Sequence, residues 1–192
     1  MRNQLDVDWT TIPSPLDDGA AKHLTGAHPP AVGLHASDGS LIDLSSLTGL
    51  TVVYVYPRTG RPDQSVLDGW DMIPGARGCT PQSCAFRDHF TELRQAGVRH
   101  LFGLSSQDTD YQQEVAERLH LPFVLLSDAR FLLTDALKLP EFQASGLRLL
   151  KRLTMILRDG VVAKVFYPVF PPDRDAENVL AWLRWQRDGK SI

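Results

Sequence analysis

The chain contains two cysteines, Cys79 and Cys84, which lie five positions apart in the stretch GCTPQSCAFRDHF. The first is followed by Thr80-Pro81, and proline suits the first position of a helix because it has no N–H group. The proline also disfavours helical dihedrals at Thr80. The sequence therefore predicts that a helix begins at Pro81, with both thiols near its N-terminal end. Such a pair could be buried apolar side chains, a structural disulfide, a metal site or a redox pair.

The first two of these roles fit the predicted helix poorly. At 100° per residue, Cys84 lies roughly opposite the apolar stripe of Phe86, Phe90 and Leu93, so we expect it off the main core face unless another element covers it. Ideal helix geometry separates Cα atoms five residues apart by about 8.6 Å. A disulfide requires roughly 4.4–6.8 Å. A bond between the two sulfurs would therefore need local unwinding, which suits a switch better than a static crosslink.

A metal site would need more ligands than the cysteine pair supplies. Two thiolates leave a tetrahedral zinc site two ligands short. The chain has six histidines, which are scattered along it: His23, His28, His35, His89, His100 and His120. A copper chaperone of the Sco type would have closer cysteines and a later histidine than this chain offers. We expect no metal, with a copper-binding module kept as an alternative.

A redox role accounts for the position of Cys79 better than the other three roles do. Helix N-termini present unpaired N–H groups and the positive end of the macrodipole, which favour the nucleophilic thiolate over the thiol. Arg77, two residues earlier, could add to this field. The thiol of Cys84 is close enough in sequence to arrive by local unwinding.

The elements that must position these thiols follow an alternating order of strands and helices. Apolar and β-branched runs predict strands, 3.6-residue periodicity predicts helices, and Asp159-Gly160 between two alternating runs predicts a hairpin. In chain order we expect a strand at 51–57, a helix from Pro81 to Gly97, a strand at 98–105, a helix at 110–121, an extended segment at 122–128, a hairpin at 152–170 and a helix at 175–186 capped by Asp175. Two βαβ-like crossovers followed by a hairpin predict an α/β thioredoxin-like fold, with a mixed central sheet flanked by helices.

Two segments lack regular periodicity. Residues 1–29 are rich in Pro, Gly and Asp and predict an extended lead-in that packs over the domain. Residues 58–77 form a long loop-like segment before the first cysteine, and ordered loops of this length are usually functional. We expect one domain spanning residues 1–192.

Composition excludes several classes of partner. Net charge is −3, and 22% of residues are charged, so the sequence does not indicate binding to nucleic acid or to an anionic membrane. The N-terminus MRNQLDVDWTT carries acidic residues and lacks the basic start and apolar centre of a secretory signal. We expect a cytoplasmic protein, in which a thiol pair is more often catalytic or metal-binding than structural.

Several stretches together resemble a known family. From about Pro29 to the final helix, the chain is similar to the peroxiredoxins, specifically the Q-type or bacterioferritin-comigratory branch. The similarity rests on LIDLSSLTGLTVVYVYP, GCTPQSCAFRD, LFGLSSQD, LPFVLLSD and KRLTMILRDG, in this order and spacing. The second stretch resembles the family's peroxidatic segment, and the last resembles the strand that carries its active-site arginine.

The resemblance implies a thiol-dependent peroxidase without a cofactor. Cys79 would be the peroxidatic cysteine, Cys84 the resolving cysteine and Arg152 the active-site arginine. The substrates would be hydrogen peroxide and organic hydroperoxides. An intramolecular disulfide between Cys79 and Cys84 would be recycled by thioredoxin or a glutaredoxin. Members of the branch occur as monomers or homodimers.

The chain departs from the family in the segment before Cys79. The family usually carries Thr or Ser three positions before this cysteine, and here that position is Ala76. We interpret residues 58–77 as an insert after the strand that ends at Pro57, and Thr59 becomes the candidate for the missing hydroxyl. Thr80 is a second possibility, and Trp70 in the insert could cover the pocket. A non-enzymatic redox sensor would use the same cysteines, so only turnover separates it from a peroxidase.

Overall fold

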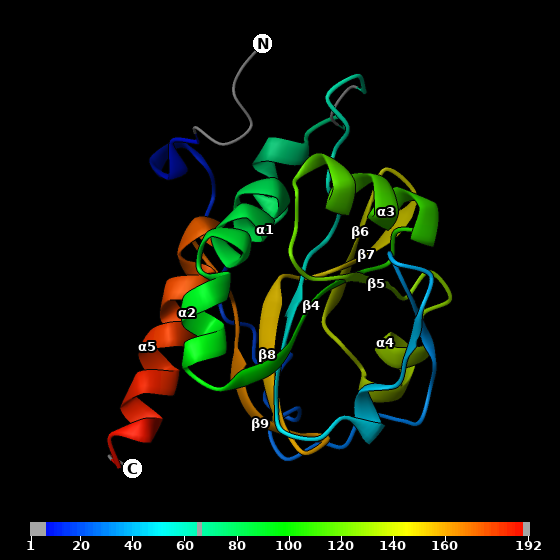
Figure 1. Cartoon of the computed structure of the whole chain (residues 1–192). Coiled ribbons are helices and arrows are strands. Elements are labelled where there is room, and N and C mark those ends of the chain that lie inside the picture. The colour runs from blue at the N-terminus through cyan, green and yellow to red at the C-terminus, as the bar shows by residue number, and fades with distance from the viewer. Residues whose placement is uncertain (1–6, 65–66, 190–192) are drawn as a thin grey trace.

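A computed structural model describes residues 7–64 and 67–189 of the chain. Its centre is a seven-stranded sheet with the order β2-β1-β5-β4-β3-β8-β9, and β6 and β7 form a separate two-stranded ribbon (Figure 1). The strands are β1 (Leu34–Ala36), β2 (Leu41–Ile42), β3 (Leu50–Val55), β4 (Val98–Ser105), β5 (Leu125–Ser127), β6 (Glu141–Ala144), β7 (Leu147–Leu150), β8 (Leu153–Arg158) and β9 (Val161–Phe166).

Strand pairing confirms the mixed sheet that the sequence predicts. Strand β3 pairs in parallel with β4, and β4 pairs in parallel with β5. On its other side β3 pairs with β8 in antiparallel orientation, so that Val52 lies between Leu101 and Ile156. The predicted hairpin joins β8 to β9 through Asp159 and Gly160, both of which have positive φ. This connectivity is that of a thioredoxin-like fold.

Helices cover both faces of the sheet, and the core therefore has two halves (Figure 1). One half packs Tyr54 against Phe86 and Val179, beneath α1, α2, α3 and α5. The other packs Val53 against Leu133, beneath α4 and part of the lead-in. The helices are α1 (Cys79–Asp88), α2 (Phe90–Gln95), α3 (Thr109–Arg118), α4 (Leu132–Leu137) and α5 (Asp175–Arg187).

The first helix begins two residues earlier than predicted. Helix α1 starts at Cys79, so the expectation that Thr80 stays outside helical dihedrals is wrong. Pro81 is the third residue of the helix, where its N–H group would have no intrahelical partner in any case. The first intrahelical bond is donated by Gln82 N to Gly78 O over 3.0 Å. Cys79 therefore occupies the first helical position.

The helix that the apolar stripe predicts is interrupted at His89, which separates α1 from α2. The expectation that Cys84 lies off the core face is also wrong, because only 5% of its surface is exposed and it belongs to the same core cluster as Cys79. Helix α1 packs against α5 and the 3₁₀ helix η4 (Pro172–Arg174) as well as the sheet. All residues from Cys79 to Phe86 are buried as a result.

Part of each irregular segment lies near the start of α1. In the lead-in, whose first six residues are outside the described range, the indole N–H of Trp9 donates to Asp173 over 2.8 Å and Leu24 is fully buried. The insert between β3 and α1 contains the short 3₁₀ helix η3 (Trp70–Met72), which the sequence does not predict. The ribbon β6–β7, strand β1 and helix α4 also have no counterpart in the prediction, because these elements are too short to show a clear period.

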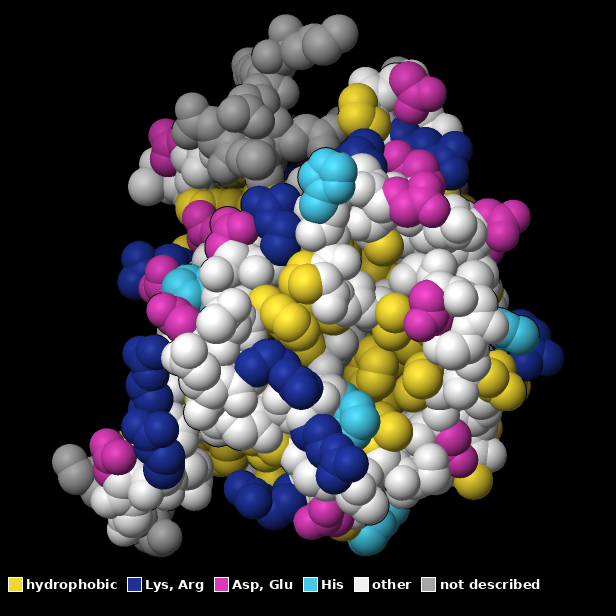
Figure 2. Space-filling model, in the orientation of Figure 1, with side chains coloured by type: hydrophobic (Ala, Val, Ile, Leu, Met, Phe, Trp, Pro, Cys, Tyr) yellow, Lys and Arg dark blue, Asp and Glu magenta, His cyan; other side chains and the backbone are white. Residues whose placement is uncertain are grey.

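Among the described residues, no helix combines the length and apolarity that crossing a membrane requires. Positive and negative side chains are interspersed on the face shown in Figure 2, around hydrophobic side chains that reach the surface between the elements.

Helix α5 begins at Asp175, but the prediction that this residue caps the helix is wrong. Asp175 is the first helical residue, and its side chain is fully buried. Its carboxylate accepts hydrogen bonds over 2.7 Å each from Gln82 of α1 and Thr154 of β8. Burial raises the pKa of Asp175 to about 6, while these hydrogen bonds and the nearby Arg152 act in the opposite direction.

Gly78 sets the position of the first helical residue, and we predict that it tolerates no side chain. Its φ is +105°, and a Cβ there would lie 2.6 Å from Pro172 Cγ and 2.7 Å from Trp9 Cη2. Gly97 has a similar φ of +97° with open space around it, so Gly97→Ala is a matched control. In urea unfolding, Gly97→Ala should lose about 1 kcal/mol, and Gly78→Ala at least about 1 kcal/mol more. Equal losses would show that the close contacts carry no energy.

The buried Asp175 predicts a specific dependence of stability on pH. Its pKa is about 6 in the folded chain against 3.8 for an unperturbed aspartate, so between these values the folded state binds more protons than the unfolded state. Its contribution to stability therefore falls as pH rises from about 4 to 6. Asp175→Asn removes this titration. Urea unfolding should show the variant gaining stability relative to the wild type between pH 4 and pH 7, by up to about 3 kcal/mol. A difference that stays constant with pH would contradict the assignment.

Candidate active site

The thiol of Cys79 lies at the N-terminal end of α1, where the backbone N–H groups of the first turn have no intrahelical partners. The residue is 3% exposed. Its Sγ lies 3.6 Å from the carbonyl oxygen of Ala76, to which the thiol donates. The sulfur therefore lies at the N-terminal end of the helix, in contact with the turn that leads into it.

Arg152 is the cation that contacts this sulfur. It lies directly before β8, and its guanidinium Nη2 donates to Cys79 Sγ over 3.2 Å. The same nitrogen lies 3.3, 3.2 and 3.1 Å from the carbonyl oxygens of Gly75, Ala76 and Arg77. Only 3% of Arg152 is exposed, so its charge acts in a medium that screens it weakly. One guanidinium thus joins the sulfur to the turn in front of it.

A chain of buried polar side chains continues from Arg152 into the protein. Its Nη1 donates to Gln82 Oε1, and Gln82 Nε2 donates to Asp175 Oδ2. Thr154 donates its hydroxyl to the same carboxylate oxygen. Arg152 directly precedes β8 and Thr154 lies within it, two residues further on. Side chains two residues apart along a strand share a face, so both point to the face that α1 and α5 cover. The chain of contacts links both helices to β8 through polar groups.

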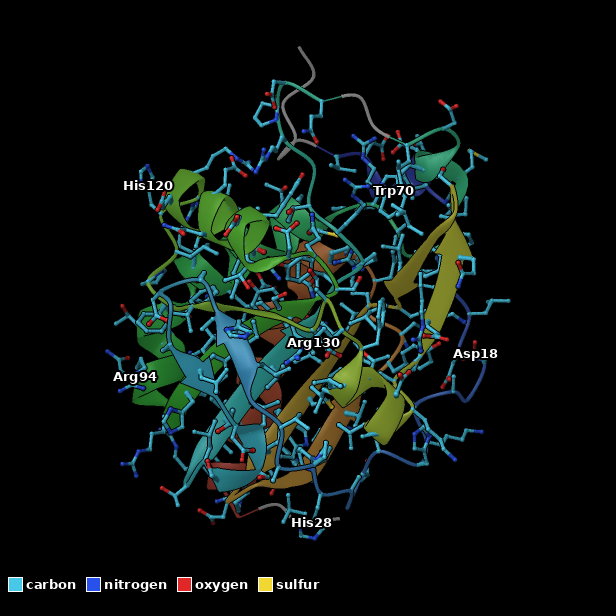
Figure 3. The ribbon with its side chains drawn as sticks, turned by 90° about the vertical axis from the view of Figure 1, so that its right-hand side faces the viewer. Asp18, His28, Trp70, Arg94, His120 and Arg130 are labelled. Atoms are coloured by element: carbon cyan, nitrogen blue, oxygen red, sulfur yellow. The ribbon has the colours of Figure 1, made fainter. Side chains whose placement is uncertain are left out.

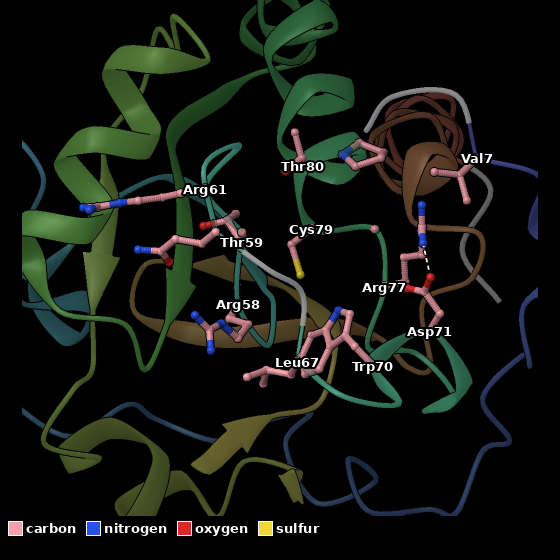
Figure 4. Close-up of a pocket in the computed structure, with 14 residues that line it drawn as sticks. Val7, Arg58, Thr59, Arg61, Leu67, Trp70, Asp71, Arg77, Cys79 and Thr80 are labelled. Carbon is pink, nitrogen blue, oxygen red and sulfur yellow. Dashed lines mark hydrogen bonds and ion pairs between the residues drawn. The ribbon is translucent and has the colours of Figure 1, made fainter. Parts of the chain in front are cut away.

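The sulfur of Cys79 opens toward a cavity of about 120 Å³ beside the insert (Figure 4). Trp70 and Leu67 form an apolar wall of this cavity, and Trp70 is itself buried. Arg58 lies on the other side of the sulfur from Trp70. Arg77 also lines the cavity, but its guanidinium pairs with Asp71 and not with the sulfur. A small molecule with a polar end and an apolar body would fit between these walls.

Thr59 lines the same cavity but does not contact the sulfur through any hydrogen bond in the described part of the chain. It is 1% exposed, and both its backbone N–H and its hydroxyl donate to Gln107 Oε1, over 2.8 and 3.2 Å. Thr80, the second candidate for the hydroxyl, lines the cavity too. The hydroxyl of Thr59 is therefore bonded to Gln107 in the loop after β4, and Thr59 forms part of the cavity wall.

Cys84 shares helix α1 with Cys79, and both cysteines are free thiols. Burial raises the pKa of the Cys84 thiol, with Arg87 opposing this effect to a smaller extent. Next to it in sequence, Ser83 accepts a hydrogen bond from Tyr54, whose ring stacks on Phe86 at 4.4 Å between centroids. Cys84 is thus held, protonated, in a well-packed part of α1.

The histidines do not gather around the cysteines. His28 and His120 lie at opposite ends of the molecule (Figure 3). His89, at the end of α1, pairs with Glu92 over 2.8 Å. Within residues 7–64 and 67–189, no three side chains of His, Cys, Asp or Glu are grouped as metal ligands would be.

Sequence reasoning missed Gln82 and Asp175, although a signal for both was present. Gln82 precedes Phe86 and Phe90 at intervals of four, and Asp175 precedes Val179 and Leu183 in the same way. Such spacing places each polar residue on the buried stripe of its own helix. An acidic residue before a helix is more often a cap, and that pattern led to the wrong interpretation of Asp175.

Comparisons with known proteins agree with this geometry. The Redoxin family model matches residues 24–180. Chloroplastic peroxiredoxin Q of Suaeda salsa is 31% identical over 166 residues, which cover 85% of this chain and 69% of that protein. The corresponding protein of Populus jackii is also 31% identical over 166 residues, covering 85% of this chain and 70% of its own length.

Solved structures show the same fold. Peroxidoxin BcpB of Mycobacterium tuberculosis superimposes with a TM-score of 0.66 at 26% identity, over 83% of this chain and 96% of that one. A Xanthomonas campestris bacterioferritin comigratory protein, described for its alkyl peroxide reduction activity, gives a TM-score of 0.67 at 22% identity, over 84% and 98% of the two chains. The chain therefore belongs to the Redoxin family and, within it, to the peroxiredoxins of the Q or bacterioferritin-comigratory branch, which are thiol-dependent peroxidases.

Proposed function

We propose that Cys79 is the peroxidatic cysteine of this peroxidase and that Arg152 stabilises both its thiolate and the breaking peroxide bond. The observation that carries the proposal is the 3.2 Å contact between Arg152 Nη2 and Cys79 Sγ at the first position of α1. A buried cation contacts this sulfur, and its position at a helix N-terminus adds the positive end of the helix dipole. The cavity beside it admits a hydroperoxide.

In the first step the Cys79 thiolate attacks one oxygen of the hydroperoxide. The S–O bond forms as the O–O bond breaks, and the departing oxygen takes a proton and leaves as water or an alcohol. Negative charge develops on both oxygens, so donors fixed in advance at these positions lower the barrier. Arg152 and the free N–H groups of α1 supply such donors. The product on Cys79 is a sulfenic acid.

In the second step Cys84 resolves the sulfenic acid. Its thiolate attacks Cys79 Sγ, the S–S bond forms, and hydroxide leaves as water after protonation. Both cysteines lie in one helix, so this step requires the first turns of α1 to unwind. Unwinding exposes Cys84 to water, which removes the burial that raises its thiol pKa.

An external dithiol then reduces the disulfide by exchange, and we assign this role to thioredoxin, with a glutaredoxin as the alternative. The apolar wall of Trp70 and Leu67 favours organic hydroperoxides in addition to hydrogen peroxide. A cytoplasmic location belongs to the same proposal, because a reducing compartment keeps both thiols free between turnovers. The protein would work as a monomer or a homodimer.

Replacement of each cysteine should separate the two steps. Cys79→Ser should abolish hydroperoxide consumption in an assay with thioredoxin, thioredoxin reductase and NADPH, because no nucleophile remains at the helix tip. Cys84→Ser should reduce about one equivalent of peroxide per chain and then stop as the sulfenic acid. Mass spectrometry of the stalled protein should show one added oxygen. Sustained turnover by Cys79→Ser would remove the assigned nucleophile.

Arg152→Lys should slow the first step strongly even though charge is conserved. A lysine ammonium cannot reach the sulfur, three carbonyl oxygens and Gln82 at once. We expect the second-order rate constant for sulfenic acid formation to fall about 10²–10³-fold, as for loss of a fixed transition-state donor. Thr59→Val, which removes a hydroxyl already bonded to Gln107, should lower it by less than about fivefold. The reverse order of effects in stopped-flow fluorescence would transfer the donor role from Arg152 to Thr59.

A further inference from the structure

Asp175 is a buried carboxylate for which the proposed peroxidase mechanism has no use. It is fully buried at the start of α5, and its Oδ1 has no hydrogen-bond partner in the described part of the chain. Burying a carboxylate with one oxygen unsatisfied is unfavourable, so its presence in the core does not follow from packing. Its other oxygen, Oδ2, is bonded to both Gln82 and Thr154.

The contact with Gln82 fixes the orientation of a side-chain amide. A glutamine amide has one acceptor end and one donor end, and the two can exchange places by rotation. An ionised carboxylate only accepts hydrogen bonds, so Asp175 requires the donor Nε2 of Gln82 to point toward it. The acceptor Oε1 must then point toward Arg152, whose guanidinium only donates.

Rotation of the amide would turn its NH₂ group toward the guanidinium, so that two donors would face each other. Arg152 would lose the hydrogen bond from its Nη1 to Gln82, which fixes the position of Nη1. The neighbouring Nη2 is the nitrogen on Cys79 Sγ. Because the guanidinium is planar and rigid, a shift at one nitrogen moves the other.

We propose that Asp175 is a positioning residue for peroxide reduction, which acts through Gln82 to hold the Arg152 guanidinium against Cys79. It does not touch the sulfur or the peroxide. Thr154 completes the arrangement by holding the carboxylate from β8. The inference rests on the proposed roles of Cys79 and Arg152.

The test uses the full chain in the Cys84→Ser background, where Cys79 is the remaining thiol. Two second-order rate constants are measured for each variant, one for hydrogen peroxide by stopped-flow fluorescence and one for alkylation by iodoacetamide. Both rate constants are measured at alkaline pH, where the Cys79 thiolate is formed in every variant. Peroxide reduction then still needs Arg152 placed against the breaking O–O bond, whereas alkylation needs only an accessible thiolate. Asp175→Ala should lower the peroxide rate constant at least about tenfold and the alkylation rate constant less than about threefold. A parallel fall of both would indicate a merely structural role.

Two further variants keep the result independent of folding. Asp175→Asn retains an acceptor oxygen for Gln82 and Thr154, so it should keep the peroxide rate constant within about threefold of the parent. Glu177→Ala removes another acidic residue from the first turn of α5, one that pairs with Arg174 on the surface, and should change neither rate constant. A large loss in Asp175→Asn, or an equal loss in Glu177→Ala, would overturn the proposal in favour of a simple effect of charge.

A double-mutant cycle tests whether Asp175 acts through Gln82. Gln82→Met removes the amide but keeps the length of the side chain, and it should lower the peroxide rate constant about as much as Asp175→Ala does. Once the amide is absent, Asp175→Ala should have no further effect, so the double variant should match either single variant. Multiplicative losses would contradict the proposed route. If Arg152→Lys also reacts normally with peroxide, the proposed function fails rather than this inference alone.

Discussion

The contact between the Arg152 guanidinium and the Cys79 sulfur is the interaction on which the rest of the structure depends. A cation in the interior is costly unless its donors find acceptors, and here backbone carbonyls, an amide oxygen and the sulfur accept from Nη1 and Nη2. Its Nε has no hydrogen-bond partner in the described part of the chain. These acceptors come from the insert, from α1 and from Cys79 itself. The guanidinium therefore fixes the insert, the helix tip and the start of β8 relative to one another.

Hydrophobic packing supplies the frame for this contact. Helix α1 lies over β3, where Phe86 stacks on Tyr54, and α5 and η4 cover its other sides. Residues Cys79 to Phe86 of α1 are therefore buried. In the proposed cycle this burial holds the Cys79 thiol in fixed geometry for its substrate, and it would be given up when Cys84 reaches Cys79.

Much of the fold could be predicted from the sequence, because strong local patterns determine it. The strand at 98–105 matches β4, the Asp159-Gly160 turn forms the hairpin, and the cysteine pair lies in the first helix. The residues that depend on tertiary contacts were not predictable in the same way. Cys84 is buried because elements distant in the sequence pack on more than one side of α1, which helical periodicity within α1 does not represent.

The residues of the candidate site likewise depend on tertiary contacts that local sequence patterns do not show. The proximity of Arg152 to Cys79 came from a resemblance to a family and not from any local pattern, since the two residues are 73 positions apart. Asp175 was interpreted as a cap because caps are the common use of aspartate before a helix. Only the packing of three elements shows that it faces inward to Gln82 and Thr154.

The crowding at Gly78 has a consequence for the reductant. Trp9 and Pro172 pack against this glycine, where Pro172 is buried and Trp9 is half-buried. In the proposed cycle, opening of the tip would separate these two side chains from Gly78, and the oxidised protein would gain a nonpolar surface that the thiol form does not display. A reductase that binds this surface would distinguish spent molecules from active ones by shape alone, before any sulfur is exchanged.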